Sequence, residues 1–243
     1  MIASKGRSLV SVLCILAVLM TGIVLVTESS DANTYCAKIG DQEYTSFDGA
    51  ITAANSTDGE VTIQIYSMVS YTDSTPDLAN AHKINFIGMS SDAEIYIDRE
   101  GTKGYISGTP NSGVTDVTFK DLILSKNVGP GTTPDAAVMN TYFTVYKVGD
   151  VSYTNCIVPT GACTQGTTTT YSHCTFDNED DGNYGLWIYA NTTCTVDDCD
   201  FIGARGIKMY SESVTNNNAD RDNHLILRDT RFHEEVTEKP AIV

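Results

Sequence analysis

The chain has 243 residues, and its 31 acidic side chains outnumber 15 basic ones, which gives a formal net charge of −16. This charge argues against nucleic acid as a partner, because no basic surface is available to neutralise a run of phosphates. It also argues against a polybasic attachment to anionic lipid. Hydrophobic residues make up 41% of the chain, which is enough to build a folded core.

The N-terminal segment has the composition of an export signal. Lys5 and Arg7 precede an apolar run at residues 9–26, and the small residues Ser30 and Ala32 follow it. This order is typical of a secretory signal peptide, although the run is also long enough to span a bilayer. We therefore predict that residues 1–32 form a signal peptide or an uncleaved N-terminal anchor. Both alternatives make the protein secreted or cell-surface, and any membrane attachment would come through the anchor alone.

Residues 33–60 are predicted to form an N-terminal cap that contains one short helix. Thr45 or Ser46 can cap this helix, and Asn55 and Gly59 end it. Its apolar positions fall on one face: Phe47, Ala50, Ile51 and Ala54.

Beyond residue 60 the chain consists of related β-rich runs. Each run reads inward, outward, inward, two polar residues, inward, outward, inward, and successive runs start 18 to 34 residues apart. An imperfect strand repeat of this length is typical of a solenoid, because stacking units about 4.8 Å apart buries an apolar side that one unit cannot bury alone. A β-sandwich remains the alternative, but it does not explain why the polar pair recurs at one place. The clear copies begin at Val117, Val151, Thr169, Cys194 and Leu225, and a weaker copy begins at Ile84.

The second polar residue of each pair marks a bend. Asx side chains at such a position hydrogen-bond nearby backbone and can stack into a ladder. The residues concerned are Asp121, Asn155, His173, Asp198 and Asp229. A shorter repeated unit also occurs at residues 185–189 and 206–210, with a looser copy at 143–146.

Segments such as 153–158 and 171–176 resemble coils of right-handed parallel β-helices of the pectate-lyase-like superfamily, which includes many secreted adhesin-like proteins. The opening at residues 37–51 resembles the strand-plus-helix start that caps such proteins. The resemblance implies an all-β fold in which residues 61–243 form a right-handed parallel β-helix solenoid. Because residues 239–243 resemble the start of another coil, we expect the β-helix to be incomplete at the C-terminus and its open end to self-associate.

Four of the cysteines fall on inward positions of the repeat. Cys156, Cys174 and Cys199 occupy the same position, and Cys194 occupies another. The chain has no Cys-x₂-Cys pair, which disfavours zinc. We predict mostly buried free thiols, with disulfides in an oxidising compartment as the alternative.

The densest acidic cluster follows the third clear repeat. Asp177, Asp180 and Asp181 could bind calcium, serve as an acid–base pair in glycoside cleavage, or form a solvated loop. No other cofactor is expected. Asp200 is predicted to lie on the outer face and form an ion pair with Arg231 of the next coil.

The shorter unit places an aromatic pair on the outer face. If Leu186 and Ile188 point inward, Trp187 and Tyr189 point outward, and Lys208 and Tyr210 lie beside them on the next coil. Such a face either packs against sugar rings or stabilises the sheet through cross-strand pairs. Trp187, Tyr189, Lys208 and Tyr210 are therefore the predicted glycan-binding residues.

The expected function is that of an exported adhesin-like module that binds glycans or a surface partner without catalysis. The alternative is a polysaccharide lyase or glycoside hydrolase acting on acidic polysaccharide, since one fold hosts both kinds of function. Arg205 is the one basic residue that we would assign to such a lyase. The Asn-Thr-Asp and Gly-His-Gly elements of polygalacturonases are missing from the sequence, so no catalytic residue is assigned.

Overall fold

The structure is a computed structural model, and it divides the chain into two units, residues 1–33 and 34–243. It describes residues 35–71, 77–78, 81–97, 105–108, 116–126, 143–146, 148–158, 160–164, 168–177, 184–189, 192–203, 206–210, 223–233 and 242. The predicted signal or anchor lies outside these residues. Within them, no helix is both long enough and apolar enough to cross a membrane.

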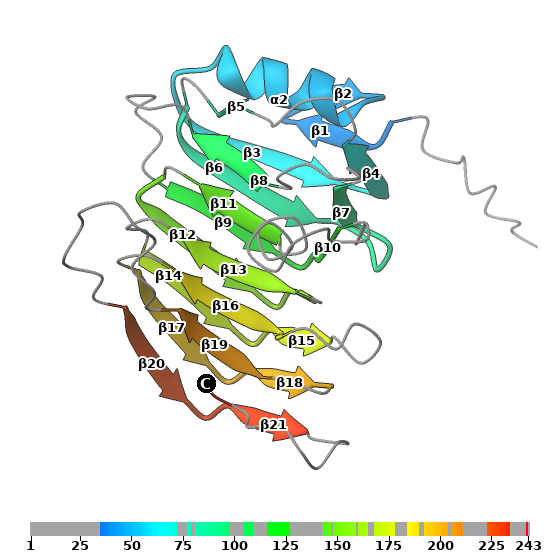
Figure 1. Cartoon of the computed structure of the whole chain (residues 1–243). Coiled ribbons are helices and arrows are strands. Elements are labelled where there is room, and N and C mark those ends of the chain that lie inside the picture. The colour runs from blue at the N-terminus through cyan, green and yellow to red at the C-terminus, as the bar shows by residue number, and fades with distance from the viewer. Residues whose placement is uncertain are drawn as a thin grey trace, which may run out of the picture. The chain divides into compact units, whose positions relative to one another are not determined.

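The second unit is all-β, with parallel sheets and one described helix. The largest sheet, called sheet A here, is parallel from β3 onward, while β1 pairs antiparallel with β2 and with β3. Figure 1 shows its strands lying side by side in succession. In spatial order they are β2 (Gln42–Tyr44), β1 (Ala37–Ile39), β3 (Gly59–Ile65), β6 (Ala81–Gly88), β9 (Asp116–Lys120), β12 (Asp150–Thr154), β14 (Thr168–Ser172), β17 (Thr193–Asp197) and β20 (His224–Arg228).

Two further parallel sheets take the remaining strands, from β4 onward. Sheet B contains β4 (Met68–Tyr71), β7 (Glu94–Ile97), β10 (Ile123–Lys126), β15 (Thr175–Asp177), β18 (Asp200–Ile202) and β21 (Arg231–His233). Ile157 bridges its two halves by pairing with Ile123 and Thr175. Sheet C contains β5 (Asp77–Leu78), β8 (Tyr105–Gly108), β11 (Phe143–Tyr146), β13 (Gly161–Thr164), β16 (Leu186–Tyr189) and β19 (Ile207–Tyr210).

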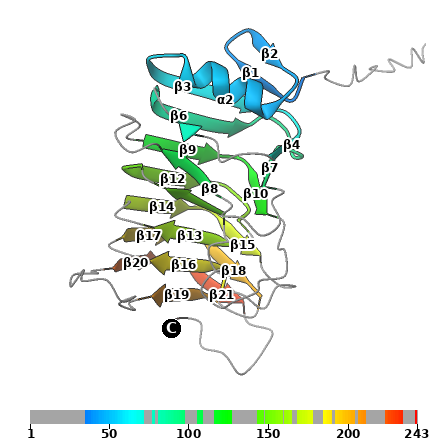
Figure 2. The same ribbon diagram turned by 45° about the horizontal axis from the view of Figure 1, so that its top comes forward.

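From β3 onward the chain visits sheets A, B and C repeatedly in that order (Figure 2). The pairing register confirms the sequence alignment of the repeats, since Val117 pairs with Val151, Val151 with Thr169, and Thr169 with Cys194. The shorter unit is confirmed too, because Leu186 pairs with Ile207 and Trp187 with Lys208. Residues that are equivalent in the repeat therefore lie on top of one another.

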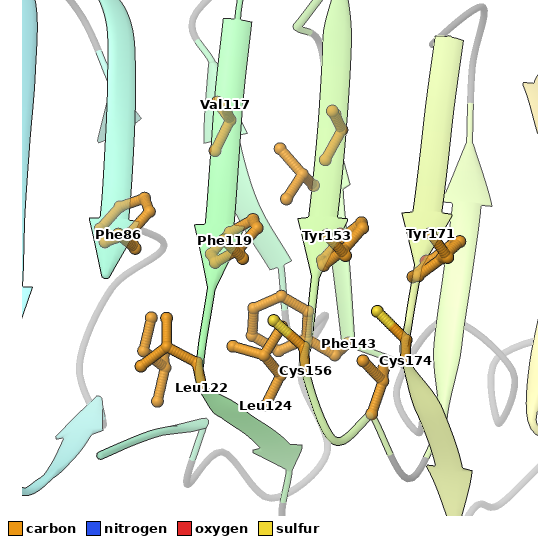
Figure 3. Close-up of a cluster of buried hydrophobic side chains, with 14 of the residues drawn as sticks. Phe86, Val117, Phe119, Leu122, Leu124, Phe143, Tyr153, Cys156, Tyr171 and Cys174 are labelled. Atoms are coloured by element: carbon orange, nitrogen blue, oxygen red, sulfur yellow. The ribbon is translucent and has the colours of Figure 1, made fainter. Parts of the chain in front are cut away.

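This register builds a core of stacked rings. Phe86, Phe119, Tyr153 and Tyr171 follow one another along sheet A with centroids 5.1, 5.0 and 4.4 Å apart and ring planes within 9° of parallel (Figure 3). Each such pair contributes about 0.5–1.5 kcal/mol beyond its buried area. A second stack in sheet B joins Phe176, Phe201 and Phe232, at 4.2 and 4.9 Å.

The polar bend residues adopt the left-handed backbone conformation. Their φ angles lie between 45° and 56°, which Asn and Asp tolerate better than most L residues. The Asn155 Nδ2 donates to Asp121 Oδ1 at 2.6 Å, so part of the predicted ladder is present. The positive-φ positions are Asp121, Asn155, His173, Asp198 and Asp229, the bend residues of the sequence repeat.

The predicted short helix is confirmed as α2 (Phe47–Asn55). Ser46 is its N-cap and accepts a hydrogen bond from the Gly49 N–H at 3.2 Å. The helix packs on the β3 end of the sheets, where the ring centroids of Phe47 and Phe86 are 6.0 Å apart. Its buried residues are Phe47, Ala50, Ile51 and Ala54, as the sequence pattern predicts.

The described cysteines are free in the structure, and the state of the thiols in the mature protein stays a prediction. Cys156, Cys174 and Cys199 are at most 1% exposed, and Figure 3 shows the first two in a row beside Leu122. At these positions the thiol fills the space of a small apolar side chain.

Candidate functional site

A depression of about 280 Å³ opens where β6, β9 and β12 turn from sheet A toward sheet B. Its polar lining comes from Ser90, Ser91, Asp121 and Asn155, and its apolar lining from Ala93, Leu122, Ile123 and Ile157. It combines hydroxyl, carboxylate and amide groups with an apolar surface.

One wall exists because the turn after β6 is longer than the bends below it. Ile87 pairs with Lys120, and Glu94 pairs with Ile123. Between these two pairs the first connection consists of residues 88–93, whereas the equivalent connection after β9 consists of residues 121–122 only. The Ser90 Oγ donates to the Tyr66 carbonyl at 2.7 Å and accepts from the Asp92 N–H at 3.3 Å. These bonds fix the turn, and its serine hydroxyls reach the depression.

Gly88 allows this turn to start close to the next bend. A Cβ on Gly88 would lie 1.8 Å from the Asp121 carbonyl oxygen, so no side chain fits there. The backbone of the longer turn is therefore in direct contact with the bend residue that supplies the carboxylate.

Asp121 and Asn155 form the polar edge. The Asn155 side chain donates a hydrogen bond to Asp121 Oδ1, and Asp121 Oδ2 lies 3.9 Å from the Lys120 ammonium. The Asp121 side chain is 37% exposed. Ile157 is 43% exposed next to them. The edge can accept hydrogen bonds from ligand hydroxyls while Ile157 contacts an apolar ligand face.

The predicted aromatic site differs from expectation in solvent access. Leu186 and Ile188 are fully buried, as expected, but Trp187 on the opposite face of β16 is only 9% exposed. Tyr184 packs edge-on against it, and Lys208 Nζ lies 4.9 Å from its ring centroid. Strand alternation gives the direction of the side chain but not what covers it, so Trp187 points outward and is still nearly buried.

The side chains of Tyr189 and Tyr210, the other two predicted glycan-binding residues, lie outside the described ones, although their backbones complete β16 and β19. Lys208 is half-buried and also lies over Tyr184, at 5.6 Å. The structure therefore brings Trp187 and Lys208 together as an outer-face cation–π pair.

The predicted calcium residues fall mostly beyond what the structure describes. Asp177 is exposed at the end of β15, while Asp180, Asp181 and Arg205 lie outside the described residues. Among the residues that are described, no group of His, Cys, Asp and Glu side chains is suited to hold a metal ion.

The predicted ion pair between Asp200 and Arg231 is confirmed. It is bidentate, with N–O distances of 2.7 and 2.8 Å, and His233 Nε2 adds a contact to Asp200 at 2.8 Å. Hydrogen bonds from Arg231 and His233 lower the pKa of the Asp200 carboxyl to about 2. Asp200 therefore has a structural partner on this surface.

The depression was not predicted from the sequence, although two signals for it were present. Residues 88–93 lengthen one bend, and Ile157 puts an apolar side chain at an outward position where later repeats have Thr175, Asp200 and Arg231. Each deviates from the repeat, and the two deviations meet at the depression.

Comparisons with protein-family models, with curated proteins and with solved structures find no match for this chain. The resemblance to the pectate-lyase-like superfamily therefore depends on the sequence pattern alone.

Proposed function

We propose that this protein is an exported, adhesin-like module, displayed at a cell surface, that binds glycans and does not cleave them. Its scaffold is a right-handed parallel β-helix solenoid. The repeated A–B–C order of parallel strands supports this scaffold, and crossovers between parallel strands are right-handed in most proteins. The apolar run at residues 9–26 supports export.

The observation that carries the glycan proposal is the depression beside Asp121. Sugar rings present hydroxyl groups around their edge and C–H groups on their faces, so they need hydrogen-bonding groups next to an apolar surface. Asp121, Asn155 and the serine hydroxyls supply the first, and the exposed Ile157 supplies the second.

The size of the depression indicates the size of the ligand unit. Its volume of about 280 Å³ lies just below the roughly 300–1,000 Å³ of most small-molecule pockets. We infer that it takes one terminal or branching sugar, and that neighbouring sugars contact the surrounding strands.

The chemistry of the lining favours binding over cleavage. Glycoside hydrolysis generally uses two carboxyl groups on opposite sides of the scissile bond. Of the described residues that line the depression, Asp121 supplies a carboxylate, and the others supply hydroxyl, amide or apolar groups.

The test is glycan-array binding by the full chain, followed by titration of the glycans that bind. We expect Asp121→Asn to weaken binding about tenfold or more, because the negative charge and one of the two acceptor oxygens are lost at constant shape. Asp229→Asn is the matched control, since Asp229 has the same repeat position with φ 45° and does not line the depression. Ile157→Ala should also weaken binding, with Ile226→Ala, at 39% exposure on β20, as its control.

Three outcomes would overturn parts of the proposal. Equal binding by D121N and D229N would remove the depression as the site. Loss of binding in Trp187→Ala or Lys208→Ala alone would move the site to sheet C and keep the function. Shortened glycan chains after incubation would make the protein an enzyme.

A further inference from the structure

Two buried thiols touch across the interior between sheets A and C. Cys163 lies on β13 of sheet C and Cys194 on β17 of sheet A, and their Sγ atoms are 3.5 Å apart. Both are at most 1% exposed. β13 and β17 belong to different sheets, so the two side chains approach each other from opposite walls of the core.

We propose that Cys163 and Cys194 are a disulfide site, oxidised when the protein matures in a thiol-oxidising compartment. The bond requires the sulfurs to close from 3.5 Å to about 2.05 Å, a movement shared by two side chains on facing strands. This inference goes beyond glycan binding, and the proposed export would supply the compartment.

The stacked cysteines offer a poorer geometry for the same reaction. Cys174 and Cys199 occupy equivalent positions in successive passages, and the Cys174 N–H donates to Cys199 Sγ at 3.4 Å. Side chains stacked in register leave their strands in parallel directions, which disfavours the dihedral angle near 90° that a disulfide adopts. Cys163 and Cys194 are not subject to this constraint.

The chemistry is thiol–disulfide exchange with an external disulfide, such as oxidised glutathione or a protein thiol oxidase. One cysteine thiolate attacks the oxidant and forms a mixed disulfide, which releases one reduced thiol. The second cysteine thiolate then attacks the sulfur of the first, and the other half of the oxidant leaves as a thiol. Two electrons and the two thiol protons pass to the oxidant.

The burial of the pair places this reaction during folding. The hydrogen bond with Cys163 and desolvation raise the pKa of the Cys194 thiol well above its usual range. Little Cys194 thiolate is therefore present in the folded protein, and burial shields both sulfurs from an external oxidant. In the unfolded or partly folded chain both thiols are accessible.

The bond would close a loop around one passage of the chain. The bond would link β13 of sheet C to β17 of sheet A. The segment that it encloses contains β14, β15 and β16, which is one strand from each of the three sheets. Closing such a loop restricts the unfolded chain, and we expect a rise in Tm of about 5–15 °C.

The experiment refolds the reduced full chain in a glutathione redox buffer, alkylates the remaining thiols and maps peptides without reduction. We expect a mass two hydrogen atoms below that of the reduced chain before alkylation, two fewer alkyl groups after it, and one cross-linked peptide pair joining Cys163 to Cys194. Cys163→Ser and Cys194→Ser should each abolish this cross-link, whereas Cys156→Ser should keep it. Folded reduced protein placed in the same buffer should form the bond much more slowly.

The peptide map of the natural sequence tests for the Cys163–Cys194 bond even if a serine variant fails to fold. A fully reduced product after refolding would overturn the proposal. So would a cross-link within the stacked set, such as Cys174 to Cys199. Glycan binding is measured separately, so failure of this inference leaves the proposed function intact.

Discussion

The bend ladder makes a quantitative prediction at Asn155. This residue has φ 52° and donates its side-chain amide to Asp121 at 2.6 Å. Asn155→Ala keeps a Cβ in the left-handed region and removes the hydrogen bond. Asn155→Gly also removes the hydrogen bond, but it allows the positive φ without steric cost.

The two variants separate backbone strain from hydrogen bonding. The left-handed conformation costs roughly 1–2 kcal/mol for most residues with a Cβ, such as Ala, but less for Asn, and the hydrogen bond is worth about 0.5–1.5 kcal/mol. We therefore expect N155A to lower the free energy of unfolding by about 2 kcal/mol. N155G should lower it by about 1 kcal/mol, because glycine loses the bond and some chain entropy but carries no strain.

The assay is equilibrium urea unfolding of the full chain, with stability taken by linear extrapolation. Ser152→Ala is a suitable control, because the half-buried Ser152 lies on the adjoining β12, has the ordinary extended backbone and hydrogen-bonds Thr118. The stability lost in Ser152→Ala therefore measures the contribution of one side-chain hydrogen bond without any change in backbone strain. If N155G were less stable than N155A, the assignment of strain to this bend would be refuted.

Three other positions carry independent predictions. Gly88→Ala should destabilise by about 3 kcal/mol or more, because its Cβ would meet the Asp121 carbonyl oxygen at 1.8 Å and the backbone must move. Tyr153→Phe should stabilise by about 1 kcal/mol, because the buried Tyr153 hydroxyl has no hydrogen-bond partner among the described residues. Asp200→Asn should remove the loss of stability at low pH that comes from this ion pair. The pKa of Asp200 is about 2 beside Arg231, so the stabilisation by the ion pair is complete above about pH 4 and is lost as the pH falls through 2.

Each of these predictions has a matched comparison. Gly40→Ala, where nothing lies within 4 Å of the added Cβ, should cost only the left-handed penalty, so equal losses at both glycines would contradict the contact argument. In the reduced protein Tyr171→Phe should not stabilise, since there the Tyr171 hydroxyl accepts from the Cys163 thiol at 3.9 Å. Denaturation curves at pH 2 to 5 test Asp200, and unchanged acid sensitivity in D200N would refute that assignment.

The sequence alone predicted the parts of the fold that depend on periodicity. Stacking places equivalent residues over one another, so the alignment of Val117 with Val151 and Thr169 is also the pairing register of sheet A. The helix was predictable because Ser46 and the spacing of its apolar residues are local signals. The bends were found as polar pairs, but their positive φ emerged only from the structure.

The candidate site was less predictable because it arises where the repeat is interrupted. The turn at residues 88–93 and the outward Ile157 are separated in sequence, and only the register places them together. Trp187 points away from the core as alternation predicts, but contacts with Tyr184 and Lys208 leave it 9% exposed.

Cys163 was missed as a partner of Cys194 for a similar reason. Its strand reads Gly-Ala-Cys-Thr, which has little hydrophobic alternation, so no sequence pattern indicates that Cys163 lies in the core. Contact between strands of different sheets is not encoded in a repeat alignment, which records only neighbours within a sheet. The thiol pair therefore appears only when the three sheets are assembled.

The most direct test of the account is one titration series with a glycan panel that includes polygalacturonate, in which binding and product chain length are measured in the same samples. We expect the natural protein to bind a glycan and to leave its chain length unchanged. We also expect Asp121→Asn to weaken this binding about tenfold or more and Asp229→Asn to keep it. Shortened chains, or equal binding by the two variants, would contradict it.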